Sequence, residues 1–275
     1  MSPDWLGASR RAASALRSML EERTTIAERV VETGTRGEGG DRTLEIDALA
    51  EELIFAELQV LYDAGARFTV LSEERGTVDF GSAETLVVVD PIDGSLNAKR
   101  RLPHHSISIA VADGPTMADV FFGYVHDFGP GEEWVARRGQ GAWLDGRRLS
   151  MEPGERRGPD GKLEVLGIES ADPRWIREAA DALAERAYRV RALGTIASTL
   201  CQVAAARLDG MVTLRGCRSV DAAAGQLIVR EAGGLIAFPR CATPLGAPLD
   251  LVPHSPLVAA RTAQGLEELA TVPVV

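Results

Sequence analysis

The chain has 275 residues, is 45% hydrophobic and carries a formal net charge of −10 at pH 7. This length suits one large domain, or two subdomains that share a core. The negative charge argues against nucleic acid as the main ligand, because binding to a phosphate backbone needs a basic surface. No apolar run approaches the roughly 18 residues that a membrane-spanning helix needs, and residues 1–11 lack the apolar core of a secretory signal. We therefore expect a cytoplasmic protein that binds neither nucleic acid nor a membrane.

Cysteine and histidine usage argues against disulfide-stabilised and zinc-binding classes of protein. The three cysteines, Cys201, Cys217 and Cys241, include no closely spaced pair, so neither a disulfide framework nor a structural zinc site is expected. The four histidines are scattered, and the adjacent pair His104 and His105 does not match the helical histidine pair of zinc proteases.

The first expected element is a helix that opens at Ser2-Pro3-Asp4, a segment that supplies a cap and places Pro3 in the first turn. Apolar residues then recur at helical spacing. Residues 33–41 are polar and rich in glycine, which predicts a mobile loop. Asp41 is then expected to cap a second helix, whose apolar positions continue to Leu61.

Strands are expected in the next part of the chain. Phe68–Ser72 predicts a short strand that ends at Glu73-Glu74, and the apolar run Thr85–Asp90 predicts a strand buried on both faces. Between residues 106 and 149 several short apolar runs follow one another, and Asp145-Gly146 supplies a hairpin turn. This part of the sequence predicts an antiparallel meander.

Residues 151–162 are rich in proline, glycine and charge, and we expect a boundary there between an α+β subdomain, 1–155, and an α/β subdomain, 156–275. Beyond the boundary, helices and strands alternate, as is typical of an α/β unit. Helices are expected over 172–186, 195–207 and 221–232, and strands over 188–192, 211–213 and 235–238.

Acidic residues stand where two of the predicted strands end. Glu73 and Glu74 follow the first strand, Asp90 ends the second, and Asp93 comes three residues later. Open α/β sheets build their sites at the carboxyl ends of strands, so we expect these side chains to converge. Crowded carboxylates repel one another and resist ionisation, and a hard divalent cation relieves that repulsion. Ligands that offer only oxygen favour Mg²⁺ over zinc.

The segment Asp90-Pro-Ile-Asp-Gly-Ser95 adds further groups of this kind. Pro91 fixes the turn between the two aspartates and leaves the Ile92 carbonyl to act as another oxygen ligand. The amides of Gly94 and Ser95 then open a helix, which is a natural site for a phosphate. Taken alone, the segment is equally consistent with a capped turn before a helix.

Asp221 opens another predicted helix, where an acidic residue by itself is usually only a favourable partner for the helix dipole. Residues 194–197 form a second tight turn before a helix. Together these motifs resemble those of the inositol monophosphatase superfamily, in the family order, over roughly residues 40–260. The motifs are Glu73-Glu74, Asp90-Pro-Ile-Asp-Gly-Ser95, Gly194-Thr-Ile-Ala197, Asp221-Ala-Ala-Ala-Gly225 and Glu231-Ala-Gly-Gly234.

The resemblance implies a layered α-β-α-β-α sandwich, usually in a homodimer, that hydrolyses phosphate monoesters with the help of Mg²⁺. The first subdomain would hold the antiparallel sheet and most metal ligands, and the second would complete the site. Two or three ions per subunit are expected. The implied ligands are Glu73, Asp90, the Ile92 carbonyl, Asp93 and Asp221.

The resemblance also assigns roles in hydrolysis. Asp47 and the hydroxyl of Ser95 would orient the attacking water. Many relatives have threonine at the position of Ser95. One metal would be held by Glu73, Asp90 and Ile92 and would activate that water. Glu73 would therefore take part in catalysis through this metal. A second metal, held by Asp90, Asp93 and Asp221, would face the leaving group, and a weaker third ion is expected near Glu73. The amides of Gly94 and Ser95 would hold the phosphate.

Substrate recognition departs from that of inositol monophosphatases, which bind the inositol hydroxyls with a glutamate at the position of Leu214 here. The arginines that follow, Arg215 and Arg218, resemble those of archaeal-type enzymes that act on both fructose 1,6-bisphosphate and inositol phosphates. Arginine also suits a second phosphate. The basic run Lys99-Arg100-Arg101 is likewise a candidate for holding a doubly phosphorylated sugar. Ordinary surface charge is the alternative for this run and for the two arginines. The expected substrate-binding residues are Asp93, Gly194, Thr195, Arg215 and Arg218.

The expected substrate is a small phosphorylated sugar or polyol. We place fructose 1,6-bisphosphate, or dual specificity, first and inositol monophosphate close behind. Within the same superfamily, 3′-phosphoadenosine 5′-phosphate and histidinol phosphate are the alternatives. The alternative from another class is a non-catalytic regulator that binds a phosphometabolite, and the complete set of carboxylates argues against it.

Overall fold

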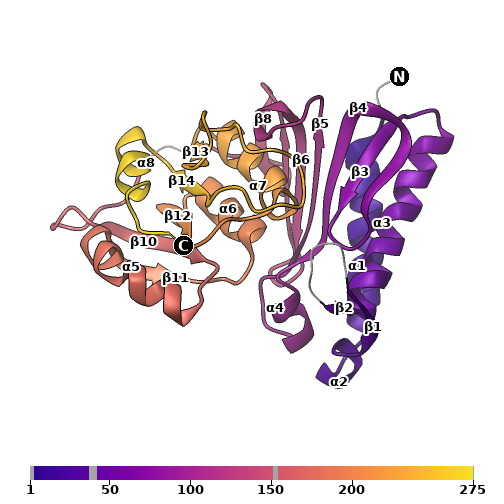
Figure 1. Cartoon of the computed structure of the whole chain (residues 1–275), viewed down its shortest axis with the longest axis horizontal. Helices are drawn as coiled ribbons and strands as arrows, with labels where there is room; N and C mark the ends of the chain where they lie inside the picture. Colours follow the sequence, from indigo (N-terminus) through magenta and orange to yellow (C-terminus); the bar gives the residue numbers. More distant parts are fainter. Residues whose placement is uncertain (1–2, 37–41, 151–153, 275) are drawn as a thin grey trace.

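The computed structural model describes residues 3–36, 42–150 and 154–274. Helices and sheets alternate in five layers across the molecule (Figure 1). From one side to the other these layers are a helix pair, a five-stranded sheet, a second helix pair, a seven-stranded sheet and a third helix pair. The predicted α-β-α-β-α sandwich is therefore confirmed.

The seven-stranded sheet is built almost entirely from strands in chain order. Its order is β3-β4-β5-β6-β7-β8-β9, and all pairs from β4 onward are antiparallel. The predicted meander is thus confirmed, and its hairpin turns at Asp145 and Gly146, with φ of 48° and 74°. The strands are β3 Phe68–Ser72, β4 Gly76–Asp93, β5 Ser106–Ala112, β6 Val120–Asp127, β7 Glu132–Arg137, β8 Gly141–Leu144 and β9 Arg147–Arg148.

Strand β4 is much longer than the predicted run and folds around β3. Val70 of β3 pairs with Val78 in the first part of β4 and with Val87 in its second part. Strand β3, which leads directly to Glu73, therefore has a hydrogen-bonded neighbour on both sides.

The five-stranded sheet has the order β11-β10-β12-β14-β13. Strand β10 runs parallel to β11 and β12, whereas β14 is antiparallel to β12 and β13. The sequence predicted β11, β12 and β13 but missed β10 and β14. The strands are β10 Leu163–Glu169, β11 Ala187–Arg191, β12 Gly210–Thr213, β13 Leu235–Ala237 and β14 Val258–Ala260.

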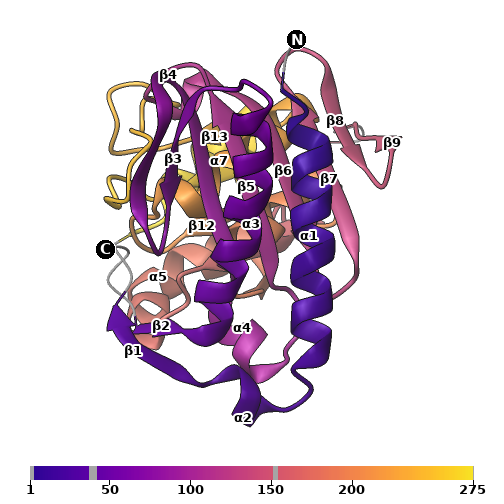
Figure 2. The ribbon, with the colours of Figure 1, turned by 90° about the vertical axis from the view of Figure 1, so that its right-hand side faces the viewer.

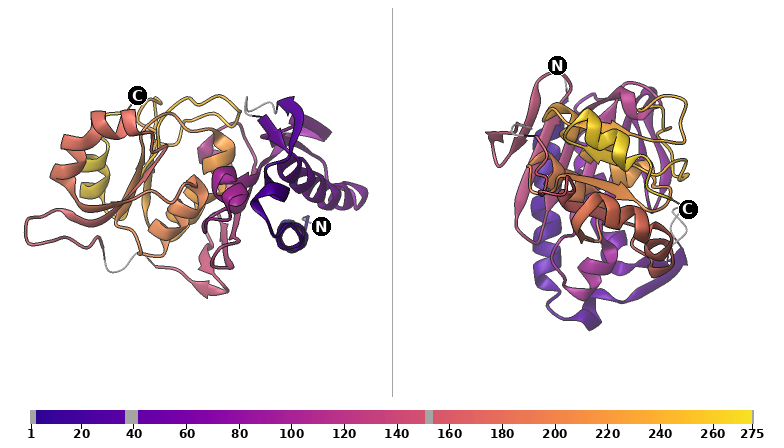
Figure 3. Two further views of the ribbon diagram at one scale, coloured as in Figure 1. Left: turned by 90° about the horizontal axis from the view of Figure 1, so that it is seen from below. Right: turned by 90° about the vertical axis from the view of Figure 1, so that its left-hand side faces the viewer.

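Each helix layer covers one or two sheet faces. Helices α1 Trp5–Glu22 and α3 Glu45–Asp63 cover the outer face of the seven-stranded sheet (Figure 2). Helices α5 Pro173–Arg186 and α8 Ala263–Leu269 cover the outer face of the five-stranded sheet (Figure 3). Helices α6 Ile196–Ala204 and α7 Ser219–Glu231 lie between the sheets. Shorter helices are α2 Ile26–Arg29, α4 Ser95–Arg100 and the 3₁₀ turn Met117–Asp119. No helix in the described part of the chain has the length and apolar character of a membrane span.

The central helices are buried on all sides because both of their faces meet a sheet. Every residue of α6 is buried, including the polar residues Ser198, Thr199 and Gln202. Small residues let α7 approach its neighbours closely. A Cβ atom on Gly123 of β6 would lie 2.8 Å from the carbonyl oxygen of Ala224 in α7. The backbones of β6 and α7 therefore touch directly, and this contact fixes the depth of α7.

Two expectations about the first part of the chain need correction. Residues 33–36, expected in a loop, belong to strand β1 Glu32–Arg36, which pairs with β2 Arg42–Leu44. Backbone pairing with β2 orders the residues of β1. Residues 37–41, with the predicted cap Asp41, lie outside the described residues. Helix α1 begins after Pro3 rather than around it, with Asp4 as the N-cap that accepts from the Gly7 amide. The division into subdomains at residue 155 stays a prediction.

The contact at Gly123 generates a stability prediction. Gly123→Ala should lower the free energy of unfolding by about 1–3 kcal/mol, because the added methyl group meets backbone atoms that cannot rotate away. Urea unfolding followed by circular dichroism measures the change. Gly154→Ala is the matched control, since the one described atom near its Cβ would be Cγ2 of Thr262, at 3.3 Å. Equal stability of the two variants would contradict the proposed close contact.

Candidate active site

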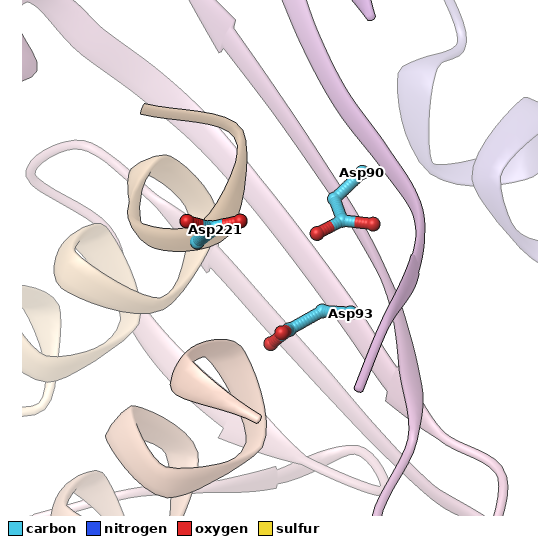
Figure 4. A group of neighbouring side chains, drawn as sticks. All are labelled: Asp90, Asp93 and Asp221. Atoms are coloured by element: carbon cyan, nitrogen blue, oxygen red, sulfur yellow. The ribbon is translucent and has the colours of Figure 1, made fainter. Parts of the chain in front are cut away.

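Three aspartates from two distant segments converge between the sheets. Asp90 and Asp93 lie at the end of β4, and Asp221 lies in the first turn of α7. Each offers a carboxylate oxygen, and these oxygens all lie within 4.8 Å of one another. Figure 4 shows the three carboxylates facing one another. All three side chains are buried, with exposures of 1%, 7% and 7%. The expected convergence at a strand end is found for Asp90 and Asp93. Asp221, which the family resemblance assigned to the site, joins them from the start of a helix.

The turn after Asp93 is fixed by a glycine that no other residue replaces easily. Gly94 has φ +90°, and a Cβ atom there would lie 3.1 Å from the carbonyl oxygens of Gly194 and His104. Asn97 reinforces the turn, because its Nδ2 donates to the carbonyls of His104 (2.8 Å) and Leu193 (2.6 Å). The end of β4 is thereby held against the turn that precedes α6.

Burial and mutual repulsion both raise the pKa values of Asp90 and Asp93. Burial raises the pKa of Asp90 well above its ordinary value, and the charges of Glu73, Asp93 and Asp221 raise it further. Burial likewise raises the pKa of Asp93, with Asp221 as the largest charge contribution. A divalent cation would stabilise the ionised carboxylates, and their oxygen-only donor set fits a hard ion such as Mg²⁺. The residues present therefore fit the metal that the sequence predicts.

Asp93 also accepts hydrogen bonds from the start of α6. Its Oδ2 accepts from the Thr195 hydroxyl at 2.5 Å and from the Ala197 amide at 2.6 Å. Thr195 is at the same time the N-cap of α6, since its hydroxyl accepts from the Ser198 amide. Thr195, predicted to bind substrate, thus contacts Asp93 directly, and Gly194, predicted with it, precedes it in the turn.

Arg218 connects Glu73 to the aspartate cluster. Its guanidinium lies 2.6 Å from Glu73 Oε1 and 2.9 Å from Asp221 Oδ1. Burial raises the pKa of Glu73, and the positive charge of Arg218 opposes that increase. Glu73 is therefore brought to the site through a guanidinium, an arrangement that the sequence did not indicate.

The remaining predicted residues of the β4–α4 turn are also close together. The Ser95 hydroxyl donates to the Ile92 carbonyl at 2.9 Å, and the Ile92 amide donates to Asp90 Oδ1 at 3.0 Å. Asp47 lies in the first turn of α3 and is 7% exposed.

Arg215 and Leu214 lie elsewhere than the predicted substrate role suggests. Arg215 is exposed, and its guanidinium lies 5.4 Å from the ring centroid of Trp175 in α5. Leu214 is fully buried in the core between the five-stranded sheet and its outer helices. Substrate binding by Arg215 stays a prediction that no contact to the aspartates supports.

Sequence reasoning missed Glu169, which ends β10 and is 2% exposed. Its carboxylate accepts from the amides of Leu193 (2.9 Å) and Gly194 (3.1 Å) and from the hydroxyl of Thr199 (2.6 Å). Burial raises the pKa of Glu169 to about 7. Glu169 thus holds the turn that contacts Asp93, and an apolar run ending in glutamate, as at Glu73, was the available signal.

Comparisons with known proteins support the family assignment. The model of the inositol monophosphatase family matches residues 4–272. A fructose-1,6-bisphosphatase/inositol-1-monophosphatase of Thermococcus kodakarensis is 37% identical over 202 residues, which cover 73% of this chain and 71% of that protein. The Nus factor SuhB of Haemophilus influenzae is 32% identical over 232 residues, with coverages of 83% and 81%.

A solved structure supports the fold alone. The crystal structure of an inositol monophosphatase–fructose 1,6-bisphosphatase superposes with a TM-score of 0.82 at 24% identity, covering 98% of this chain and 99% of that one. These findings confirm the predicted class of enzyme, a metal-dependent phosphatase of phosphate monoesters. The chain belongs to the inositol monophosphatase family.

Proposed function

We propose that this enzyme is a Mg²⁺-dependent phosphatase that acts on fructose 1,6-bisphosphate, inositol monophosphate or both. The observation that carries the proposal is the buried cluster of Asp90, Asp93 and Asp221, whose oxygens lie within 4.8 Å of one another. Relatives named for both substrates, in Thermococcus kodakarensis and Methanothermobacter thermautotrophicus, support the choice of substrates. We further propose a cytoplasmic homodimer, as the family resemblance implies.

Two or three Mg²⁺ ions per subunit would be held by the oxygens of Glu73, Asp90, Ile92, Asp93 and Asp221. When bound, the ions supply Lewis-acid charge that polarises the phosphoryl group and makes nearby water more acidic. Arg218 already neutralises part of this acidic cluster through its contacts with Glu73 and Asp221.

The protein itself binds the phosphate and orients water. The backbone amides of Gly94 and Ser95 lie at the start of the short helix α4. They would donate to the phosphate oxygens. Asp47 and the Ser95 hydroxyl would hold a water in line with the scissile P–O bond, with Asp47 accepting its proton. The water oxygen adds to phosphorus, the ester oxygen leaves and takes up a proton, and the products are an alcohol and inorganic phosphate.

Arg218 is our candidate for a second substrate phosphate. It is the guanidinium in contact with the acidic cluster, and its side chain is 20% exposed. Its planar fork can bind two phosphate oxygens at once. A bisphosphate would profit from this contact, whereas inositol 1-phosphate has no second phosphate to bind there.

Asp90→Asn tests the metal site. Removing this charge should lower turnover at least tenfold, about 1.4 kcal/mol in the barrier, and should abolish the rise in melting temperature that Mg²⁺ produces by binding the folded state. The metal-free variant should melt higher than the metal-free parent, because asparagine removes a carboxyl group whose ionisation is disfavoured in the folded state by burial and by the charges of Glu73, Asp93 and Asp221. Phosphate release and thermal melts with and without EDTA measure these effects.

Asp181→Asn, in an exposed position on α5, is the matched control and should behave like the parent. Turnover of Asp90→Asn within about tenfold of the parent would contradict the assigned role. Full activity of the parent in EDTA would instead show that the enzyme does not need a metal. Absence of any activity in the parent, with a normal Mg²⁺ response in the melts, would favour a non-catalytic binding protein.

Arg218→Gln tests the choice of substrate. The variant should lose at least about tenfold more kcat/KM with fructose 1,6-bisphosphate than with inositol 1-phosphate. The ratio between the two substrates cancels any effect of the substitution on Glu73 or Asp221, because both substrates use the same metal site. Equal losses would remove Arg218 from substrate recognition. A preference of the parent for inositol 1-phosphate of more than about tenfold would reverse the proposed ranking.

A further inference from the structure

A pocket lies at the C-terminal end of α1, apart from the aspartate cluster. Its volume is about 340 Å³, a size at which proteins bind small ligands. The end of α1, Arg29 of α2, the loop that follows α4 and the turn after β6 line it. Figure 2 shows α2 and α4 beside this end of α1. None of the carboxylate residues of the candidate active site belongs to its described lining.

Arg29 places a buried positive charge in the wall of this pocket. The side chain is 7% exposed, and its guanidinium donates to the carbonyls of Arg23 (2.9 Å), Ala98 (2.8 Å) and Leu20 (2.5 Å). Burial lowers the pKa of Arg29, and the nearby Arg101 lowers it further. No carboxylate forms an ion pair with Arg29 within the described ranges. A buried charge without a counter-ion is costly, so the pocket favours an anion.

Two further arginines add to this positive charge. Arg17 contacts the Nε2 atom of His126 at 2.5 Å, and Arg101 donates to the carbonyl of Thr24. Over residues 3–36, 42–150 and 154–274, neither guanidinium has a carboxylate partner. The lining thus contains three arginines against one carboxylate, Glu21.

His105 lies in the wall of the pocket and is 7% exposed. The ring packs against Phe128, with 5.8 Å between centroids. Its Nδ1 atom has no access to solvent, so the ring shapes the wall and does not contact a ligand oxygen.

We propose that this pocket binds a small phosphate monoester. The dianionic phosphate would interact with Arg17, Arg29 and Arg101, since guanidinium forks match phosphate oxygens. The body of the ligand would lie against the apolar part of the lining, which consists of Leu20, Leu102, Pro103 and Phe128. Because Arg29 also binds the carbonyl of Ala98 in α4, the site adjoins the helix that begins at Ser95. The proposal does not depend on the substrate of the active site.

Calorimetric titration of the EDTA-treated full-length protein tests this site, with inorganic phosphate and phenyl phosphate as probes. Without divalent cations the aspartate cluster repels anions, so the active site does not contribute. We expect a dissociation constant on the order of 1 mM or lower for phenyl phosphate. Its apolar ring should make it bind about fivefold more tightly than inorganic phosphate.

The double variant Arg17→Gln/Arg101→Gln should weaken the binding of both probes at least about tenfold. These side chains are exposed, unlike Arg29, so the fold is retained. Arg147→Gln/Arg177→Gln removes the same charge from exposed positions far from the pocket and should bind like the parent. No binding to the parent, or equal weakening in both double variants, would overturn the proposal. Equal affinity for the two probes would show that the apolar lining makes no contact and would also overturn it.

Discussion

The mutual repulsion of Asp90, Asp93 and Asp221 is the constraint on which the rest of the structure depends. Three buried carboxylates within 4.8 Å of one another raise each other's energy when ionised. The cluster therefore persists only because other interactions hold its members in place. In this fold those interactions come from both sheets and from the helices between them. The geometry of the site therefore depends on the packing of the whole fold.

Three contacts hold the aspartates in place against their mutual repulsion. Close backbone contact between Gly123 and Ala224 fixes α7, and with it Asp221. Asp93 is held by the hydroxyl of Thr195 and the amide of Ala197 at the start of α6. Glu169 in turn holds the segment before α6 from the five-stranded sheet. The site is thus assembled at the meeting of the two sheets, and neither sheet contains all the parts.

Local patterns were sufficient for most strands and helices and for the convergence of Asp90 with Asp93, whereas the layers and the place of Asp221 were expected from the family resemblance. Buried runs such as Val87–Val89 and helix starts such as the one before Asp221 can be recognised from neighbouring residues alone. The contact between Arg218 and Glu73 was not predictable, because it joins side chains that meet only in the finished fold. Strand β10 was missed beside the proline- and glycine-rich stretch, and Glu169 was missed with it. Arg215 packs on Trp175 because α5 covers that face, a contact that sequence spacing does not reveal.

The folding of β4 around β3 has a consequence for how the molecule behaves among its neighbours. An exposed edge strand offers unpaired backbone groups that recruit strands from other molecules and promote aggregation. Strand β3 is shielded from such association, since Val70 pairs with Val78 on one side and Val87 on the other. Its amide protons should accordingly exchange with solvent only through larger openings of the sheet. Glu73 therefore follows directly on a strand that is hydrogen-bonded on both sides, and Arg218 holds its carboxylate before any ion arrives.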